Sequence, residues 1–190
     1  MESTGLDEII SGCKNNDRHC QKLLFELFAK KMMGVCLRYS TNYETARDMV
    51  QDGFIKVYTK ISGFKQESSL STWMTRIFIN TCLSHLNKAE SKNLYLDIND
   101  PMVQNKTELL MDDEVQVENT LKNLPVSKVL DYIAQLPLKY SVVLNMYSID
   151  GFSHQQIADA LDIQVGSSKS RLSRARQLLI ERIKTQEKLN

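Results

Sequence analysis

The sequence predicts an all-α protein with two helical domains joined by a flexible acidic linker. Only three prolines and seven glycines occur in 190 residues, which favours long helices with few tight turns. Apolar residues recur every three or four positions on both sides of an acidic stretch, which is the period of a helix with one buried face. Neither side shows the sustained alternation of apolar and polar residues that a strand would have.

Charge divides the chain into three parts. Residues 1–95 carry a net charge of +3, residues 96–118 carry −6 and residues 119–190 carry +4, although the whole chain is only +1. We therefore expect one domain over 1–95, a linker over 96–118 and a second domain over 119–190. The middle part has weak periodicity and one proline, as expected of a connector.

The first domain is predicted to be a bundle of three or four helices. Its helical patterns cover residues 18–40, 43–62 and 70–88. Asn42 is placed to cap the second of these helices, because an asparagine side chain can accept a hydrogen bond from the first turn. Gly63 and the polar run after it end that helix. The apolar stripe along each of these helices indicates a bundle but does not indicate its function.

The second domain is predicted to contain four helices and a helix-turn-helix. The helices cover residues 126–136, 138–149, 154–161 and the stretch from Val165 onward. Pro137 opens the second helix, Gly151 helps to end it, and Ser153 caps the third. A short helix, a tight turn and a longer helix carrying cations form the layout of a helix-turn-helix, in which small Ala158 lets the two helices approach closely.

The last helix has two unlike faces at 100° per residue. Its core face holds Val165, Ser168, Leu172, Ala175, Leu179 and Ile183, and the opposite face holds Gly166, Ser170, Ser173, Arg174 and Gln177. No acidic residue lies between Val165 and Ile180, whereas an ordinary solvated face normally pairs Glu with Lys. Small residues let a helix enter a groove and the neighbouring cations reach phosphates or base edges. This favours a DNA-binding face over a solvated one.

Three segments resemble motifs of bacterial sigma factors. The segment "GFSHQQIADALDIQVGSSKSRLSRARQLL" resembles the fourth-region helix-turn-helix, "ARDMVQDGFIKVY" resembles the D-x-x-Q-[ED]-x-F-x-[KR] helix, and "SLSTWMTRIFINTCLSHL" resembles the W-[LM]-x-x-I-x-x-N helix. The resemblance covers residues 21–88 and 131–181, with no room for a third-region domain between them. The chain is therefore similar to the extracytoplasmic-function (ECF) subfamily of the sigma-70 family.

The resemblance implies a protein that binds core RNA polymerase, recognises −10 and −35 promoter elements, helps to start transcription and performs no chemistry. Contacts to the −35 element would come from Gly166, Ser167, Lys169, Ser170, Arg171, Ser173 and Arg174. Contacts to the −10 element would come from Phe64, Lys65, Ser69, Trp73, Arg76 and Asn80. Contacts to polymerase, through the clamp helices of its largest subunit, would come from Asp48, Gln51, Asp52, Phe54 and Lys56. The flap of the second polymerase subunit and an anti-sigma factor are further implied partners.

Several of these residues also have a structural interpretation. Phe54 lies on the apolar stripe of its helix, and a residue such as Trp73 is more often part of a core than a platform for stacking on a base. Arg171 lies on the flank of the core face, where it could hold a phosphate or form a salt bridge within the domain. The chain departs from the motif where Ser168 replaces the usual valine on the core face, where Asp162 replaces a frequent glycine in the turn, and where Ser173 is small.

Other functions and ligands fit the sequence less well. A stand-alone regulator would explain the helix-turn-helix but not the two motifs in the first domain. An enzyme is not indicated, because the sequence contains no carboxylate cluster, glycine-rich phosphate loop or catalytic triad. Cys82 and His85 have the spacing of half a metal site, but no second half is visible, so we expect neither a metal nor a cofactor. The linker could mimic nucleic acid inside polymerase channels or be a passive connector. Without a signal or membrane-spanning pattern, we expect a cytoplasmic protein with no membrane insertion.

Overall fold

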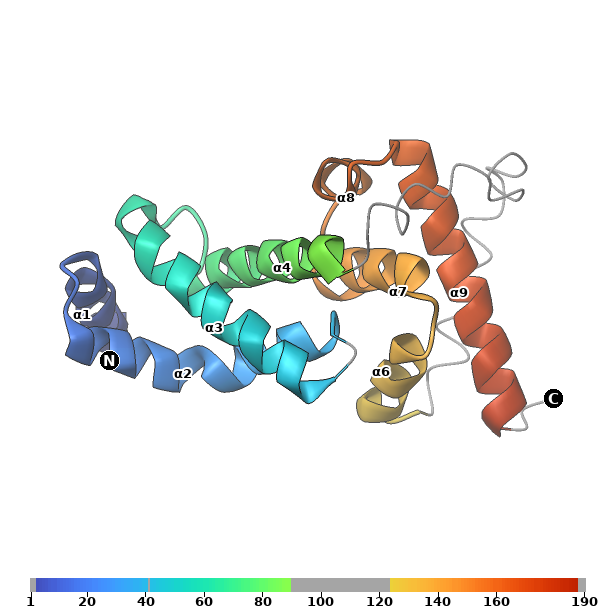
Figure 1. The fold of residues 1–190 in the computed structure, drawn as a ribbon, viewed down its shortest axis with the longest axis horizontal. Coiled ribbons are helices and arrows are strands. Elements are labelled where there is room, and N and C mark those ends of the chain that lie inside the picture. Colours follow the sequence, from blue (N-terminus) through green and yellow to red (C-terminus); the bar gives the residue numbers. More distant parts are fainter. Residues whose placement is uncertain (1–2, 41, 90–123, 188–190) are drawn as a thin grey trace. The chain divides into compact units, whose positions relative to one another are not determined.

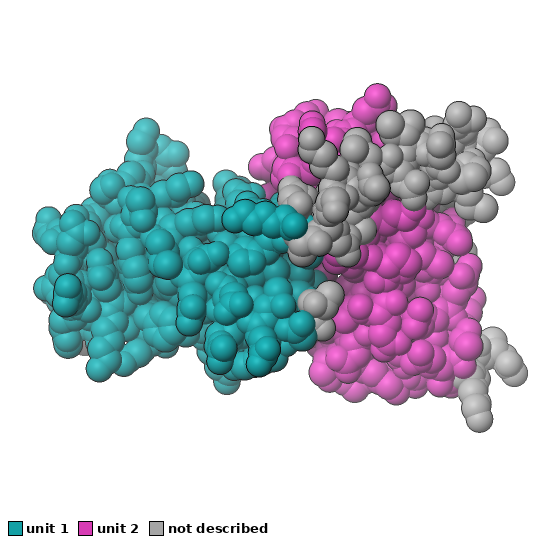
Figure 2. Space-filling model, in the orientation of Figure 1, with its two compact units in different colours: residues 1–89 teal, residues 90–190 magenta. Residues whose placement is uncertain are grey.

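The structure is a computed structural model that describes residues 3–40, 42–89 and 124–187 (Figure 1). The chain divides into two compact units, Met1–Ala89 and Glu90–Asn190 (Figure 2). Every regular element in the described ranges is helical, which confirms the predicted all-α class. The predicted linker over 96–118 and both of its boundaries lie outside the described residues, so they stay predictions.

The first unit, as described over 3–40 and 42–89, contains four α-helices and one short 3₁₀ turn. The elements are α1 (Ser3–Lys14), α2 (Arg18–Leu37), α3 (Tyr43–Lys60), η1 (Ile61–Gly63) and α4 (Leu70–Ala89). None of the three predicted helix ranges covered α1, which packs against α2 and η1 and buries Ile10 and Cys13. Helix α3 begins as predicted at Asn42, whose side-chain oxygen accepts a hydrogen bond from the Thr45 N–H (2.8 Å).

An aromatic cluster holds the centre of the first unit. Phe54 is 3% exposed, and its ring lies 4.7 Å from that of Phe25, 5.9 Å from that of Tyr58 and 5.2 Å from that of Phe78. The neighbouring Gly53 lets α3 approach α4, because a Cβ there would lie only 2.5 Å from the Phe78 ring. The buried side of α3 is therefore fixed, which determines which of its residues face outward.

Cys82 and His85 take part in different local contacts. The Cys82 thiol donates to the Cys36 sulfur at 3.7 Å, and this hydrogen bond together with burial raises the Cys82 pKa. His85 instead pairs with Asp52, with 2.7 Å between Nε2 and Oδ2. Within 3–40, 42–89 and 124–187 no group of three or more His, Cys, Asp or Glu is arranged to hold a metal, and no helix there has the length and apolar character to cross a membrane.

Over residues 124–187, the second unit contains α6 (Val126–Ala134), α7 (Leu138–Leu144), the π-helical turn η2 (Asn145–Ile149), α8 (His154–Leu161) and α9 (Val165–Glu187). Helix α9 packs against α6, α7 and α8 (Figure 1). Ser153 forms the predicted cap of α8 and makes a capping box with Gln156. The sequence did not predict η2, in which the Asp150 N–H bonds to the Asn145 carbonyl (3.0 Å) before Gly151 turns the chain at φ 73°.

The turn between α8 and α9 contains the departure noted in the sequence. Asp162 adopts a left-handed conformation, with φ 53° and ψ 49°, which favours glycine but which aspartate tolerates better than most residues. The Ile163 N–H returns to the Ala158 carbonyl at 3.0 Å, and Ala158 is only 4% exposed. Ala158 is thus buried, whereas the close approach of α8 and α9 at this residue stays a prediction.

Candidate nucleic-acid interface

Helix α9 has the two faces that its sequence predicted. Its core face is buried, with Ser168 and Ala175 at 0%, Leu172 at 1% and Leu179 at 2% exposure. Gly166 and Lys169 are exposed, whereas Ser167, Ser170, Ser173 and Arg174 are half-buried. The buried face fixes the rotation of the helix, so the small polar face points consistently away from the core.

The polar face of α9 has the chemistry of a groove-binding surface. The Ser170 hydroxyl donates to the Ser167 carbonyl (3.1 Å), so the Ser170 side chain lies close to the helix backbone and adds little bulk to this face. Arg174 donates to the Gln177 side chain at 3.3 Å, so its guanidinium is held beside that face and retains further donors. Lys169 adds an exposed cation. Cations beside a low helical surface can contact phosphates while the backbone comes close to the bases.

Arg171 and Arg176 differ from the other cations of α9. They are 8% and 7% exposed, and the Arg176 guanidinium lies over the Tyr147 ring at 5.8 Å. A guanidinium over a ring face is attracted to its electrons. The burial of Arg171 confirms the flank position predicted for it and leaves little of its side chain exposed.

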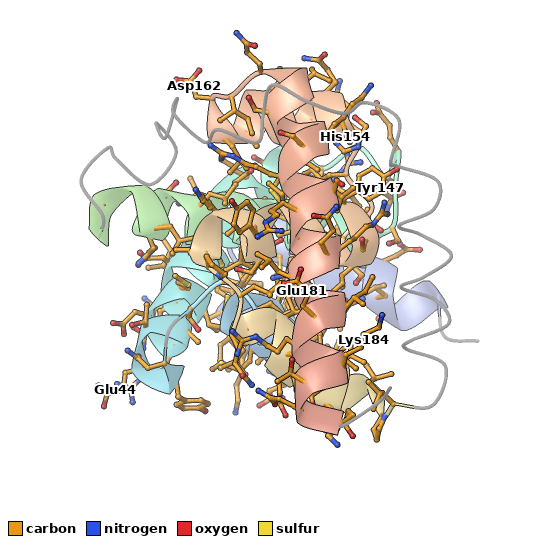
Figure 3. The ribbon with its side chains drawn as sticks, turned by 90° about the vertical axis from the view of Figure 1, so that its right-hand side faces the viewer. Glu44, Tyr147, His154, Asp162, Glu181 and Lys184 are labelled. Carbon is orange, nitrogen blue, oxygen red and sulfur yellow. The ribbon has the colours of Figure 1, made fainter. Side chains whose placement is uncertain are left out.

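A polar cluster behind the α9 face was not predicted from the sequence. His154, at the start of α8, lies 3.0 Å from the Ser168 hydroxyl through Nδ1, and its ring stacks on Tyr147 at 4.6 Å and 24° (Figure 3). Burial, followed by the charges of Lys169 and Arg176, lowers the His154 pKa. The sequence offered one indication of this cluster: Ser168 is a polar residue on the core face of α9, and a buried hydroxyl needs a hydrogen-bond partner on a neighbouring helix.

Three residues predicted to contact the −10 element share one stripe of α4. Trp73, Arg76 and Asn80 follow helical spacing, and Arg76 and Asn80 are exposed whereas Trp73 is half-buried. The Asn80 carboxamide therefore needs no buried partner. An aromatic ring, a cation and a carboxamide on one stripe can stack on and hydrogen-bond to an unpaired base.

The loop before α4 is held from both ends. Phe64 is 5% exposed and its ring lies 5.1 Å from that of Trp73, so Phe64 supports Trp73 and offers little surface of its own. Ser69 caps α4 by accepting from the Thr72 N–H (3.1 Å). Lys65 is exposed. From α1, the Lys14 amine donates to the Phe64 carbonyl at 3.0 Å, a brace that the sequence did not reveal because α1 itself was missed.

The outward face of α3 carries the residues predicted to bind polymerase, with one exception. Asp48, Gln51 and Asp52 are exposed and Lys56 is half-buried, whereas Phe54 lies in the aromatic cluster of the core. The structure therefore assigns Phe54 to the support of α3, as its apolar stripe allowed. Ile55, which was not among the predicted contacts, is 61% exposed beside these polar residues.

Comparison with known proteins bears on both units. Residues 24–92 match the family description "Sigma-70 region 2", and residues 127–179 match "Sigma-70, region 4". The chain is 27% identical over 177 residues to the ECF RNA polymerase sigma-E factor of Haemophilus influenzae, covering 92% of this chain and 93% of that protein. It is 28% identical over 178 residues to the ECF RNA polymerase sigma factor SigW of Bacillus subtilis, covering 92% and 95%.

The chain belongs to the ECF subfamily of the sigma-70 family. It is thus a promoter-recognising factor of transcription initiation. A solved structure of the sigma factor RpoE of Bartonella quintana, in complex with the anti-sigma factor NepR, shares its fold with a TM-score of 0.52 at 19% identity, covering 89% of this chain and 97% of that one.

This sigma factor also has an apolar hollow beside the far half of α9. The hollow measures about 410 Å³ and is lined by Leu136, Pro137, Leu178, Glu181, Arg182, Thr185 and Gln186. Arg182 donates to the Gln135 side chain at 2.9 Å, and the Glu187 carboxylate is 2.5 Å from the Lys128 amine. The pairing with Lys128, followed by the hydrogen bond from Tyr132, lowers the Glu187 pKa. These contacts tie the end of α9 to α6.

Proposed function

We propose that this sigma factor binds the clamp helices of the largest subunit of core RNA polymerase through the exposed face of α3. Asp48, Gln51 and Asp52 supply hydrogen-bonding groups. The Ile55 side chain, which is exposed to solvent in the free protein, supplies an apolar contact. An exposed apolar residue within a polar face is typical of a protein-binding surface. Phe54 holds the face in place from the core, and Lys56 lies at its edge.

The −10 element meets the first unit at the α4 stripe. Trp73, Arg76 and Asn80 are arranged to receive an unstacked base, with Lys65 able to contact the DNA backbone. Phe64 and Ser69 act indirectly, because one supports the Trp73 ring and the other caps α4. Capture of a base outside the stack also favours strand opening, since it offsets part of the cost of unpairing.

The −35 element meets the second unit at the polar face of α9. Gly166, Ser167 and Ser170 allow close approach, and Lys169 and Arg174 contact phosphates or base edges, with Ser173 between them. Arg171 serves the unit internally. The single observation that carries the proposed function is this face: it is small, polar, free of acids and fixed in direction by a buried opposite side.

Further partners follow from the same surfaces. The hollow lined by Leu136, Pro137 and Leu178 is a suitable seat for the flap of the second polymerase subunit, because it offers apolar surface beside polar rim residues. An anti-sigma factor would keep these surfaces from polymerase, and RpoE of Bartonella quintana, which shares this fold, is bound by the anti-sigma factor NepR. A protein with these partners acts in the cytoplasm, and its role is regulatory, without catalysis of its own.

Run-off transcription with purified core polymerase tests this assignment. The template is a pool of promoter fragments randomised over the −35 and −10 elements, each with a transcribed barcode that identifies its promoter when the transcripts are sequenced. Lys169→Ala and Arg174→Ala should each lower output from the preferred −35 sequences about 10-fold or more, because a good base or phosphate contact contributes about 1–3 kcal/mol.

The matched control is Lys184→Ala, which removes an exposed cation from the last turn of the same helix. This variant should initiate like the wild type. Normal initiation by both Lys169→Ala and Arg174→Ala would refute the assigned −35 face. A failure of the wild-type chain to bind core polymerase in a pull-down would instead refute the sigma-factor function and favour a stand-alone regulator.

A further inference from the structure

A cluster of four side chains lies behind the DNA-facing side of α9, and the role inferred for it rests on the proposed −35 contact. These residues form a closed chain of contacts between three elements. His154 of α8 is 3.0 Å from the Ser168 hydroxyl of α9 and stacks on Tyr147 of η2 at 4.6 Å. Tyr147 in turn lies under Arg176 of α9 at 5.8 Å. Both ends of the chain are thus on α9, about two turns apart.

Ser168 lies at the centre of the proposed recognition surface, although its own side chain faces inward. It is 0% exposed, and Ser167 and Lys169 on either side of it belong to the DNA-facing set. A rotation of the helix that moved the Ser168 hydroxyl away from His154 would rotate Lys169 by the same angle. The rotation of α9 about its axis therefore determines both the hydrogen bond to His154 and the direction of the DNA-facing residues.

Apolar packing holds α9 from Leu172 onward, but it is thin in the first turns, where Val165 is half-buried and Ser168 is polar. A buried serine offers little surface for packing, and its hydroxyl needs a partner because an unpaired buried polar group is costly. A hydrogen bond is directional, whereas apolar contact is not. Stacking on Tyr147 restricts the His154 ring, so the position of Nδ1 is itself fixed by η2 and Arg176.

We propose that His154 is a positioning residue for −35 recognition, which fixes the direction of the α9 DNA-facing side by holding Ser168. The role belongs to the pair and does not require His154 to touch DNA. It also gives a purpose to the π-helical turn η2, because that turn presents the Tyr147 ring to His154. Ser168, which replaces the usual valine, is then one member of a polar pair whose other member is His154.

The test uses holoenzyme assembled from the full chain and core polymerase, on a pool of promoter fragments randomised over both elements. His154→Phe retains a ring for Tyr147 and removes Nδ1, and Ser168→Ala removes only the hydroxyl. Each variant should lower the preference for the favoured −35 sequences about 3- to 10-fold, the range of one hydrogen bond. The preference at the −10 element should not change.

Two further variants separate positioning from a general loss of structure. His154→Asn places an amide near the position of Nδ1 and should recover part of the −35 preference lost in His154→Phe. The double variant His154→Phe/Ser168→Ala should lose no more −35 preference than either single variant, because both remove the same interaction. A merely destabilised chain would lose preference at both elements and would show additive losses.

The outcomes distinguish this inference from the function on which it rests. Unchanged −35 preference in His154→Phe and Ser168→Ala, together with a loss in Lys169→Ala, would overturn the positioning role alone. Unchanged preference in Lys169→Ala as well would overturn the proposed −35 face and this inference with it. If His154→Phe does not fold, Ser168→Ala decides the result, since it removes a single hydroxyl.

Discussion

The two surfaces assigned to promoter DNA are built in different ways. On α9 the residues proposed to face DNA stand on a helix whose opposite side is buried from Ser168 to Ile183. Around residues 64–69 the chain is a loop, held by the ring pair of Phe64 and Trp73 and by the amine of Lys14 on distant α1. A rigid helix suits the fixed shape of a duplex groove, whereas a braced loop beside a helix suits a base that has left its stack.

The two surfaces should therefore be vulnerable in different places. Many apolar contacts share the task of holding α9, so single changes on its outer face should alter DNA contact and little else. A few specific contacts hold the loop, so removal of any one of them should move the loop itself. We expect the strongest effects on stability at the loop and weaker ones at the turn and the polar cluster beside α9.

The largest effect is expected from Phe64→Ala. Phe64 is 5% exposed and pairs with Trp73, and loss of a buried phenylalanine typically lowers the free energy of unfolding by about 3–5 kcal/mol. Urea denaturation followed by fluorescence is suited to the measurement, because Trp73 is the only tryptophan in the chain. Lys65→Ala, a change of an exposed neighbour, should alter stability by less than about 0.5 kcal/mol. Equal effects of the two variants would show that the ring pair does not anchor the loop.

A smaller effect is expected from Lys14→Met, which keeps the length of the side chain but removes the amine that bonds to the Phe64 carbonyl. A hydrogen bond from a charged donor contributes roughly 1.5–3 kcal/mol when partly buried, and the exposure of Lys14 reduces this to about 1 kcal/mol. Holoenzyme should therefore bind a single-stranded −10 pool about 5-fold more weakly.

Lys22→Met is the matched control for the brace. Its amine lies 3.8 Å from Glu26 on an exposed face of α2 and does not reach the loop. The control should bind the −10 pool like the wild type. A loss of affinity in Lys22→Met equal to that in Lys14→Met would mean that overall charge, rather than the brace, determines binding.

Each surface also contains one residue with positive φ. Gln66 has φ 60° in the loop and Asp162 has φ 53° in the turn before α9. Glycine should relieve strain at both, by about 0.5–1 kcal/mol in the free energy of unfolding, with the larger gain at Gln66 because aspartate tolerates this conformation better. Trp73 fluorescence reports on Gln66→Gly, and hydrogen exchange of α9 amides reports on Asp162→Gly. A larger gain at Asp162 would contradict the ranking.

The smallest effect is expected from pH. Burial and the charges of Lys169 and Arg176 lower the His154 pKa below its ordinary value of 6.5, so the unfolded chain binds a proton before the folded chain does as the pH falls. The stability contributed by neutral His154 is complete above about pH 6.5 and is lost as the pH falls through the folded pKa. Hydrogen exchange of α9 amides at pH 7.5 and below should show this loss in the wild type and not in His154→Phe. Identical profiles would contradict it.

The sequence determined much of this protein because many of its signals are local. Helical periodicity, the cap residues Asn42 and Ser153, and the two faces of α9 depend on neighbours within a few turns, and the structure confirms each of them. The family motifs are local patterns too. The sequence missed α1 because this short helix is stabilised mainly by its packing on α2 and η1.

Only the tertiary structure decided which of the candidate residues are exposed and which are buried. The sequence placed Phe54, Phe64 and Arg171 among the contacts, but each is less than 10% exposed, because helices far apart in the chain pack over them. It likewise gave Ser168 no partner, since His154 lies on another helix with a turn between them. Burial and pairing of this kind depend on how helices meet, and a pattern within one helix does not contain that information.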